Sequence, residues 1–417
     1  MSTTMSVEEA LKRVLARCRP LEAEQTGLLD ALGRVLVTDA YSDIDVAPFD
    51  NSAMDGYALR AVDCANASAS EPVTLDVISH IAAGEHPTVA VGSRQAARIM
   101  TGAPIPPGAD AVVMVEHTEG GDAGRSAGGT VRIMRAPVAG EHIRRRGEEC
   151  KAGDLVLAAG EVIGPAGVGL LASTGHATVP VYRRPRVAVL STGDELVEVA
   201  EFPGPGKIRN SNSYSIAAQV LSAGGVPLRY PIVRDDPAAT REAFQRAAEE
   251  SDFIVTSGGV SVGDFDYVKP VLEELGEMEF CRVAMRPGNP QTLGSIGGVP
   301  LFGLPGNPTS AYVGFELFVR PALRYMQGYG ALDRPRQTAR LAHDVTKKQD
   351  RRYYLRARVS VAVDGVREVA LSGSQSSALL TAAHKGNCLL VLPEGEESFA
   401  AGSVVELIRL DMEEGIV

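Results

Sequence analysis

Between residues 186 and 308 one pattern occurs three times: a short apolar run, then a glycine-rich loop, then a helical segment or turn. The three stretches are "RVAVLSTGDEL", "DFIVTSGGVSVGD" and "VPLFGLPGNPTSA". Short apolar runs that end in glycine and alternate with helices are typical of parallel strands buried on both faces. The pattern therefore predicts a doubly wound α/β domain, a sheet with helices on both sides.

The chain on either side of this domain is richer in strands. Short β-branched runs cut by Gly and Pro precede it, and alternating strands that suggest a small β-barrel follow it. We therefore expect an α/β and β multidomain protein. Its three predicted parts are an N-terminal and linker region at 1–184, the α/β domain at 185–332 and the barrel at 333–417. Within the first part, residues 1–47 and 148–184 are expected to form an elongated part, and residues 48–147 a β-rich insert.

Helix boundaries follow from capping residues. Pro165 lies near the start of a helix expected at 165–173. Ser211 or Asn212 is expected to cap the helix of "SNSYSIAAQVLSAGG". In "GNPTSAYVGFELFVRPAL" we expect Pro321 to kink or end the helix, because proline lacks the N–H that the helix needs.

Charge and composition exclude several kinds of partner. The 417-residue chain has a formal net charge of −11, which disfavours a nucleic-acid coat or an anionic membrane surface. No apolar run approaches the ~20 residues that span a bilayer, and we expect no secretory signal at the N-terminus. Five cysteines lie scattered without a CxxC pair, which indicates reduced thiols and a cytoplasmic location. Histidines at metal-binding spacing are absent, so a zinc enzyme is disfavoured.

The glycine-rich loops indicate where a ligand binds. In an open parallel sheet ligands lie beyond the carboxyl ends of the strands, so residues 191–195, 257–266 and 303–308 should meet at one edge. Free N–H groups there favour an anion, above all phosphate. Neither a Walker loop nor a GxGxxG dinucleotide fingerprint is present, so the class of ligand stays open.

Acidic residues accompany these loops. Glu195, Asp235 and Asp266 lie at or beyond strand ends, where Mg²⁺ could bind between carboxylates and a substrate phosphate. The alternative is that each acid only caps a helix or fills a solvated turn.

Basic residues complete the candidate site. Arg282 and Arg286 flank "VAM" on or after a strand, and arginine suits phosphate and other tetrahedral oxyanions. The run "IRRRGEE" at residues 143–149 is either part of an anion site or a solvated charged face. "PFDNSAMDGYAL" at residues 48–59 offers two aspartates without His or Cys nearby, so it is a poor nucleophile or zinc site.

Six stretches of the sequence resemble the motifs of one known family. "PFDNSAMDGYAL", "RIMTGAPIPPGADAVVMVE", "IRRRGEE", "STGDEL", "SGGVSVGDFDYVK" and "GLPGNPTSA" closely resemble, in order, the molybdopterin molybdenumtransferases, the MoeA and gephyrin E-domain family. The resemblance implies an elongated homodimer with a molybdopterin-binding α/β domain. It also implies insertion of molybdate into adenylylated molybdopterin with release of AMP and help from Mg²⁺. The upstream adenylyltransferase and acceptor molybdoenzymes are implied partners.

The resemblance also implies roles for individual residues. The positions expected to be catalytic are Asp55, Thr101, Glu149, Glu195, Asp235 and Asp266, of which Glu195, Asp235 and Asp266 would bind the metal. The positions expected to bind substrate are Ser257, Gly258, Gly259, Lys269, Arg282, Arg286, Pro305, Gly306, Pro308, Arg356 and Ser377. In the family the pocket is built from the α/β domain of one subunit and the N-terminal loops of the other, so Asp55 would complete the site across the dimer.

Three positions depart from the family's usual residues. Glu149 stands where Asp is frequent, Asn289 stands where a second basic residue is common, and Arg286 replaces the usual Lys. These departures put the individual oxyanion contacts in question, but not the reaction.

Other functions compete with this interpretation. Gephyrin also clusters receptors, so a non-catalytic scaffold or cofactor carrier is one alternative, although the acids that a scaffold could lose are present here. The adenylyltransferase that prepares the substrate has a domain similar to residues 185–332, but it would not need the flanking regions. Tungstate could replace molybdate, because the two oxyanions are nearly the same size.

Overall fold

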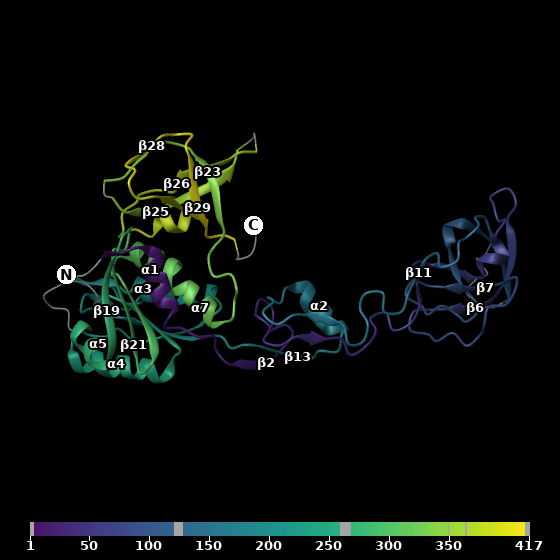
Figure 1. Cartoon of the computed structure of the whole chain (residues 1–417), viewed down its shortest axis with the longest axis horizontal. Helices are drawn as coiled ribbons and strands as arrows, with labels where there is room; N and C mark the ends of the chain where they lie inside the picture. Colours follow the sequence, from purple (N-terminus) through teal and green to yellow (C-terminus); the bar gives the residue numbers. More distant parts are fainter. Residues whose placement is uncertain (1–3, 121–127, 259–267, 349, 363–364, 413–417) are drawn as a thin grey trace. The chain divides into compact units, whose positions relative to one another are not determined.

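A computed structural model describes residues 4–120, 128–258, 268–348, 350–362 and 365–412. The chain divides into two compact units, which Figure 1 draws in the colours of the sequence. The first unit comprises Met1–Glu24 with Pro180–Val417, and the second comprises Gln25–Val179. The strands β2 (Ala23–Gly27) and β13 (Thr178–Tyr182) carry the chain from one unit to the other. Among the described residues, every helix is too short or too polar to cross a lipid bilayer.

A seven-stranded sheet forms the centre of the first unit, in the order β1-β19-β21-β22-β18-β14-β17. Its strands are β1 (Thr4–Met5), β14 (Arg186–Ser191), β17 (Val226–Arg229), β18 (Phe253–Ser257), β19 (Gly276–Val283), β21 (Pro290–Ile296) and β22 (Val299–Leu304). The neighbours β17, β14, β18 and β22 are parallel, as the sequence predicts. The sequence makes no prediction for β21, which is antiparallel to both β22 and β19. Only the two residues Gly297 and Gly298 join β21 to β22, and a loop this short can connect antiparallel strands only.

Helices cover both faces of this sheet, which confirms the doubly wound α/β arrangement. Val187 and Val189 of β14 pack with α1, α3 and α7 on one face. Ala188 and Leu190, which alternate with them, pack with α4 and α5 on the other face (Figure 1). The helices are α1 (Val7–Leu15), α3 (Ser211–Ser222), α4 (Pro237–Glu250), α5 (Val268–Leu275), α6 (Pro308–Gly314) and α7 (Arg320–Met326).

Local chemistry explains two differences from the predicted helix boundaries. Asn210, one residue before the predicted caps, accepts a hydrogen bond from the backbone N–H of Ser213 and caps α3. The helix that begins at Pro308 does not end at Pro321 but passes through a π-helical turn, η3 (Phe315–Val319), into α7. The wider turn lies just before Pro321, where an α-helical N–H would be missing.

The C-terminal part of the first unit is a closed barrel of five strands, which confirms the predicted small β-barrel. Its strands follow the order β25-β26-β23-β29-β27, and β27 pairs again with β25. They are β23 (Arg336–Leu341), β25 (Arg352–Val361), β26 (Arg367–Leu371), β27 (Cys388–Leu392) and β29 (Val404–Arg409). The short strand β20 (Met285–Arg286) follows β19 in the chain and pairs in parallel with the start of β25. This pairing fixes Arg286 against the barrel.

Smaller elements complete the first unit. They are β15 (Leu196–Val197), β16 (Ile208–Arg209), β24 (Val345–Thr346), β28 (Ser398–Phe399) and the helix α8 (Thr381–Lys385).

A six-stranded sheet in the order β8-β5-β7-β6-β10-β9 dominates the second unit, so its predicted β-rich character is confirmed. The strands are β5 (Gly56–Leu59), β6 (Val73–Ile81), β7 (Gln95–Ile99), β8 (Ala111–Met114), β9 (Thr118–Glu119) and β10 (Gly129–Ile133). The remaining elements are β3 (Ala40–Tyr41), β4 (Asn51–Ser52), β11 (Ile143–Arg144), β12 (Leu155–Leu157), η1 (Ala61–Cys64), η2 (Val115–His117) and α2 (Pro165–Ser173), and α2 has the bounds that the sequence predicts.

The helix α1 packs with the α/β core, because Val7, Ala10 and Val14 belong to the same buried cluster as Phe302 and Phe318.

The domain boundaries expected from the sequence stay predictions.

Candidate functional site

In the second unit, two predicted site residues lie in direct contact. The Asp55 carboxylate accepts hydrogen bonds from both the backbone N–H and the hydroxyl of Thr101, each 2.7 Å long. These bonds, and more weakly the charge of Arg98, lower the pKa of Asp55 below its ordinary value. Both side chains are exposed. We call this pair the acidic corner, an ionised carboxylate held at the surface in one geometry.

The strand that follows Asp55 fixes that geometry. Gly56 begins β5, and a Cβ atom there would lie 2.0 Å from the carbonyl oxygen of Val113 in the paired strand β8. Only glycine allows this approach, so the turn that carries Asp55 is anchored at its end.

The run "IRRRGEE" is mostly neutralised within the second unit. Arg145 binds the carboxylate of Asp50 at 2.7 Å, and Arg146 binds that of Asp45 at 2.6 Å. The interpretation of this run as an anion site is therefore weakened for these two arginines. Glu149 lies exposed near them, and no contact within the described residues joins it to the acidic corner.

In the first unit, the sheet edge gathers Glu195 and Asp235, as predicted. The backbone N–H of Asp194 donates to the Asp235 carboxylate at 3.2 Å, so the loops after β14 and β17 are tied together. The Glu195 carboxylate folds over Gly193, where a Cβ would lie only 2.3 Å from it. Both carboxylates are exposed, and neither forms an ion pair within the part of the chain that the structure describes.

Two further glycine loops lie at the same edge. Gly258 has a positive φ of 86°, and a Cβ on Gly306 would lie 4.0 Å from its Cα. The hydroxyl of Ser257 lies 3.1 Å from that of Ser191 in the neighbouring strand. The close approach of these loops leaves backbone rather than side chains to face a ligand.

The predicted three-carboxylate metal site falls only partly within the described residues. Asp266 and Gly259 lie outside the described residues, and of Lys269 only its place in α5 is described. Among the described residues no three His, Cys, Asp or Glu side chains form a group that could hold a metal ion.

Four predicted substrate-binding residues line one pocket of about 550 Å³ between the α/β sheet and the barrel: Arg286, Pro305, Arg356 and Ser377. Lys347, Lys348 and Arg351 also line it, and no acidic residue does so within the described chain. We call it the cationic pocket. Its positive charge, without a carboxylate in the lining, suits a small anion.

Arg356 is the buried centre of this pocket. It is only 1% exposed, and its guanidinium reaches the carbonyl oxygens of Tyr354 and Ser376 at the long distance of 3.4 Å. Its Nε has no hydrogen-bond partner among the described residues. Burial, and then the charge of Arg286, lower its pKa to about 10. A buried cation held this way is ready to bind an anion that compensates its desolvation.

Sequence reasoning missed the residues that hold Arg286. Its guanidinium donates to the Tyr353 hydroxyl at 3.2 Å and lies 5.4 Å from the centre of that ring. Lys347 lies 5.7 Å from the same ring centre. No local motif marks Tyr353, and only the pairing of β20 with β25 brings it beside Arg286.

The remaining predicted residues have other places. Arg282 lies exposed in β19 beside β1 and is not among the residues that line the cationic pocket. Pro308 starts α6, and the Gly306 carbonyl accepts a hydrogen bond from Asn212 at 2.8 Å. Gly306 and Pro308 therefore shape the loop and carry no charge.

Nearly the whole chain matches models of known protein families. Residues 5–175 match the family model "MoeA N-terminal region (domain I and II)", residues 188–325 match "Probable molybdopterin binding domain", and residues 338–410 match "MoeA C-terminal region (domain IV)".

Individual relatives belong to the same family as these models. A molybdopterin molybdenumtransferase of Staphylococcus aureus (strain COL) is 38% identical over 96% of this chain and 94% of its own. That of Bacillus subtilis (strain 168) is 38% identical over 99% of this chain and 96% of its own. The solved molybdopterin biosynthesis MoeA protein from Pyrococcus horikosii is 33% identical, with a TM-score of 0.79 over 98% of this chain and 99% of its own. The chain therefore belongs to the MoeA family, the molybdopterin molybdenumtransferases.

Proposed function

We propose that this protein inserts molybdenum from molybdate into adenylylated molybdopterin and releases AMP, a reaction of molybdenum cofactor biosynthesis. The observation that carries the proposal is the cationic pocket, where Arg356 is buried without a carboxylate partner among the described residues. Molybdate is a tetrahedral dianion, and arginine pairs well with such oxyanions. In this proposal Arg286, Arg356 and Ser377 bind molybdate.

The protein itself needs no nucleophile for this reaction. The dithiolene sulfurs of the substrate take up molybdenum, and AMP is the leaving group. The work of the protein is to bind both substrates in a suitable geometry and to balance their charges. The glycine loops at Gly258 and Gly306 present backbone close to a phosphorylated ligand.

Mg²⁺ fits the sheet edge as the divalent ion. Glu195 and Asp235 are exposed carboxylates on loops joined by the Asp194–Asp235 hydrogen bond, and neither is paired with a described cation. Such an ion takes one or two carboxylates together with substrate phosphate, and it would neutralise charge on that phosphate. We propose that Glu195, Asp235 and Asp266 bind it.

We also propose that the protein acts as a homodimer in the cytoplasm. The acidic corner would then complete the site of a second copy, with Asp55 ionised and aligned by Thr101. Glu149 would act with it. The upstream adenylyltransferase and acceptor molybdoenzymes are the proposed partners on either side of the reaction.

A defined reconstitution tests this function. Purified protein, adenylylated molybdopterin, Mg²⁺ and molybdate should release AMP and activate a cofactor-free molybdoenzyme, both in a molybdate-dependent manner. Binding of the precursor without AMP release would instead favour a carrier or scaffold. Parallel titrations with tungstate would measure the preference between the two oxyanions.

A further inference from the structure

We propose that Lys348 and Arg351, which we call the outer pair, capture molybdate at the mouth of the cationic pocket and pass it to Arg286 and Arg356, the inner pair. This inference rests on the proposed function, because it takes molybdate as the ligand of that pocket. The outer pair comes from the barrel, between β24 and β25, and both residues line the pocket.

The cations that line the pocket differ in burial. Arg356 is fully buried, Arg351 is half-buried, and Arg286 and Lys348 are exposed. A buried cation binds strongly but is reached only after the anion has lost its water. An exposed cation holds a hydrated anion weakly and attracts it from a distance. The exposed cations therefore provide for a first encounter with the anion, and the buried Arg356 provides the final site.

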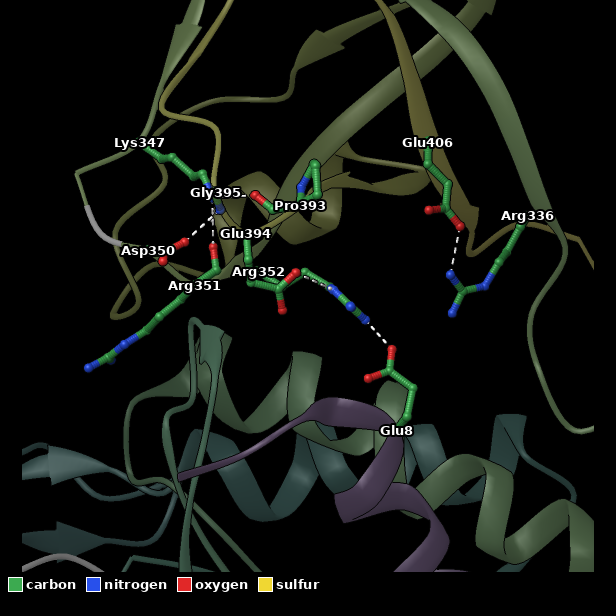
Figure 2. Close-up of polar contacts among 10 residues, drawn as sticks. All are labelled: Glu8, Arg336, Lys347, Asp350, Arg351, Arg352, Pro393, Glu394, Gly395 and Glu406. Carbon is green, nitrogen blue, oxygen red and sulfur yellow. Dashed lines mark hydrogen bonds and ion pairs between the residues drawn. The ribbon is translucent and has the colours of Figure 1, made fainter. Parts of the chain in front are cut away.

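The backbone around the outer pair is held firmly. The ammonium of Lys347 donates to the carbonyl oxygens of Arg351, at 3.0 Å, and of Pro393 (Figure 2). The Lys347 N–H donates to the Glu397 carbonyl at 2.9 Å, and the Lys348 N–H donates to the Tyr353 hydroxyl at 3.3 Å. The outer pair is thus carried on a backbone that is bonded on both sides of it.

Asp350, the acidic residue nearest to the outer pair in the sequence, is held by a hydrogen bond from another segment. Asp350 accepts a hydrogen bond from the Gly395 N–H at 2.6 Å, which ties it to the segment after β27 (Figure 2). Its carboxylate forms no ion pair with Lys348 or Arg351 among the described residues. The charge of the outer pair is therefore available to a ligand.

Neighbouring arginines of the barrel behave differently. Arg352 binds both Glu8 of α1 and Glu394, and Arg336 binds Glu406 at 2.6 Å (Figure 2). Arg409 binds Asp411 at 2.9 Å. If the outer pair were only a solvated charged surface, we would expect it to find carboxylates as these arginines do. It lines a pocket that has no acidic residue in its described lining instead.

The test uses molybdate itself and the full-length protein. Lys348→Ala, Arg351→Ala and the double variant are compared with Arg340→Ala, an exposed arginine of β23 that does not line the pocket. Equilibrium dialysis with radiolabelled molybdate gives Kd at several salt concentrations. Steady-state AMP release then gives KM for each substrate and kcat.

We expect each single variant to raise the Kd and KM for molybdate about threefold to tenfold at low salt, and the double variant to raise them further. The difference should shrink as salt screens the exposed charges, whereas kcat should not change. Lys348→Arg should restore most of the affinity, because it keeps the charge.

Three results would overturn the proposal. The first is a molybdate Kd that is unchanged in the double variant, although Arg356→Met loses binding. This result would show that the outer pair takes no part in capturing molybdate. A higher KM for adenylylated molybdopterin alone would assign the pair to the organic substrate. A wild-type protein that releases AMP but shows no molybdate binding at this pocket would end the inference while leaving the reaction in place.

Discussion

In the acidic corner a carboxylate lies at the surface, whereas in the cationic pocket a guanidinium lies buried. The Asp55 carboxylate accepts two short hydrogen bonds from Thr101, and these bonds favour its charged form. Arg356 reaches carbonyl oxygens at long distances, and its surroundings disfavour its charged form. One charge is stabilised by its neighbours, and the other is kept at a cost to folding.

This difference indicates how each region functions. A carboxylate that is already satisfied gains little from a new ligand, so the acidic corner is suited to keeping a fixed charge in a fixed place. A buried guanidinium without a carboxylate partner gains a great deal from an anion. The cationic pocket should therefore provide most of the binding free energy for molybdate, and the acidic corner should affect mainly the rate.

The largest effect is expected from Arg356→Met. Loss of a buried charge-assisted donor should reduce turnover about 10²–10³-fold and abolish molybdate binding. Because the folded pKa is lowered to about 10, the charged guanidinium costs folding free energy below that pH, and this cost falls as the pH rises through about 10. Methionine should leave the free energy of unfolding unchanged or raise it by about 1 kcal/mol. Chemical denaturation and labelled-molybdate dialysis measure the two quantities.

Arg358→Met is the matched control, since Arg358 is exposed in the same strand. It should change neither molybdate binding nor turnover. A large loss of stability in Arg356→Met, with normal binding of molybdate by the folded fraction, would show that Arg356 is structural.

The next effect is expected from Asp55→Asn, which removes the charge but keeps an oxygen that can accept from Thr101. Turnover should fall about tenfold to 100-fold with the molybdate Kd unchanged, if the charge itself is needed for the rate. Activity close to wild type would instead mean that Asp55 only shapes the turn. AMP release and dialysis distinguish these results, and Thr101→Ser, which keeps the hydroxyl, serves as the control.

The same carboxylate predicts a pH dependence of stability. Because the folded pKa of Asp55 is lowered, its hydrogen bonds to Thr101 stabilise the fold fully above the ordinary Asp value of 3.8. That contribution is lost as the pH falls through the lower folded value. The wild-type advantage in Tm over Asp55→Asn should therefore disappear in acid and stay constant near neutral pH.

A smaller effect is expected from Gly193→Ala at the sheet edge. The new Cβ would lie 2.3 Å from the Glu195 carboxylate, at a φ of 139° that side chains rarely adopt. Displacement of Glu195 should lower Mg²⁺-dependent turnover about tenfold, without changing the molybdate Kd. Gly204→Ala is the control, because no atom lies within 4 Å of its new Cβ. Equal activity of the two variants would argue against Glu195 as a metal ligand.

The sequence predicted these regions to different extents. Local signals were enough for the α/β domain, the helix α2 and the placing of Glu195 and Asp235 at the sheet edge, because each depends on residues close together in the chain. The contact between Asp55 and Thr101 spans 46 residues, and Thr101 was named only through the family resemblance. The cap of α3 was misplaced by one residue, since Asn210, Ser211 and Asn212 all have side chains suited to capping.

Other features were beyond sequence reasoning for a physical reason. The antiparallel β21 arises from the two-residue connection at Gly297 and Gly298, which the buried apolar pattern of the strands does not reveal. The cationic pocket depends on β20 crossing to pair with β25, so that Tyr353 and Lys347 come beside Arg286. No spacing in the sequence encodes that crossing.

The smallest effect is expected from Asn289→Lys, which adds a cation to the lining of the pocket. Asn289 already has a structural role. Its side-chain amide donates a hydrogen bond to the Val283 carbonyl oxygen at 2.6 Å, and its backbone carbonyl oxygen accepts one from the Val283 N–H at 2.8 Å. The substitution should lose the side-chain bond, at a cost of about 1 kcal/mol in stability, and should lower the molybdate Kd about twofold to threefold. Asn289→Met loses the same bond without adding charge, so the difference in Kd between the two variants isolates the contribution of the charge. If that difference is absent, the inner and outer pairs already provide all the positive charge that a dianion can use, and the cationic pocket is saturated.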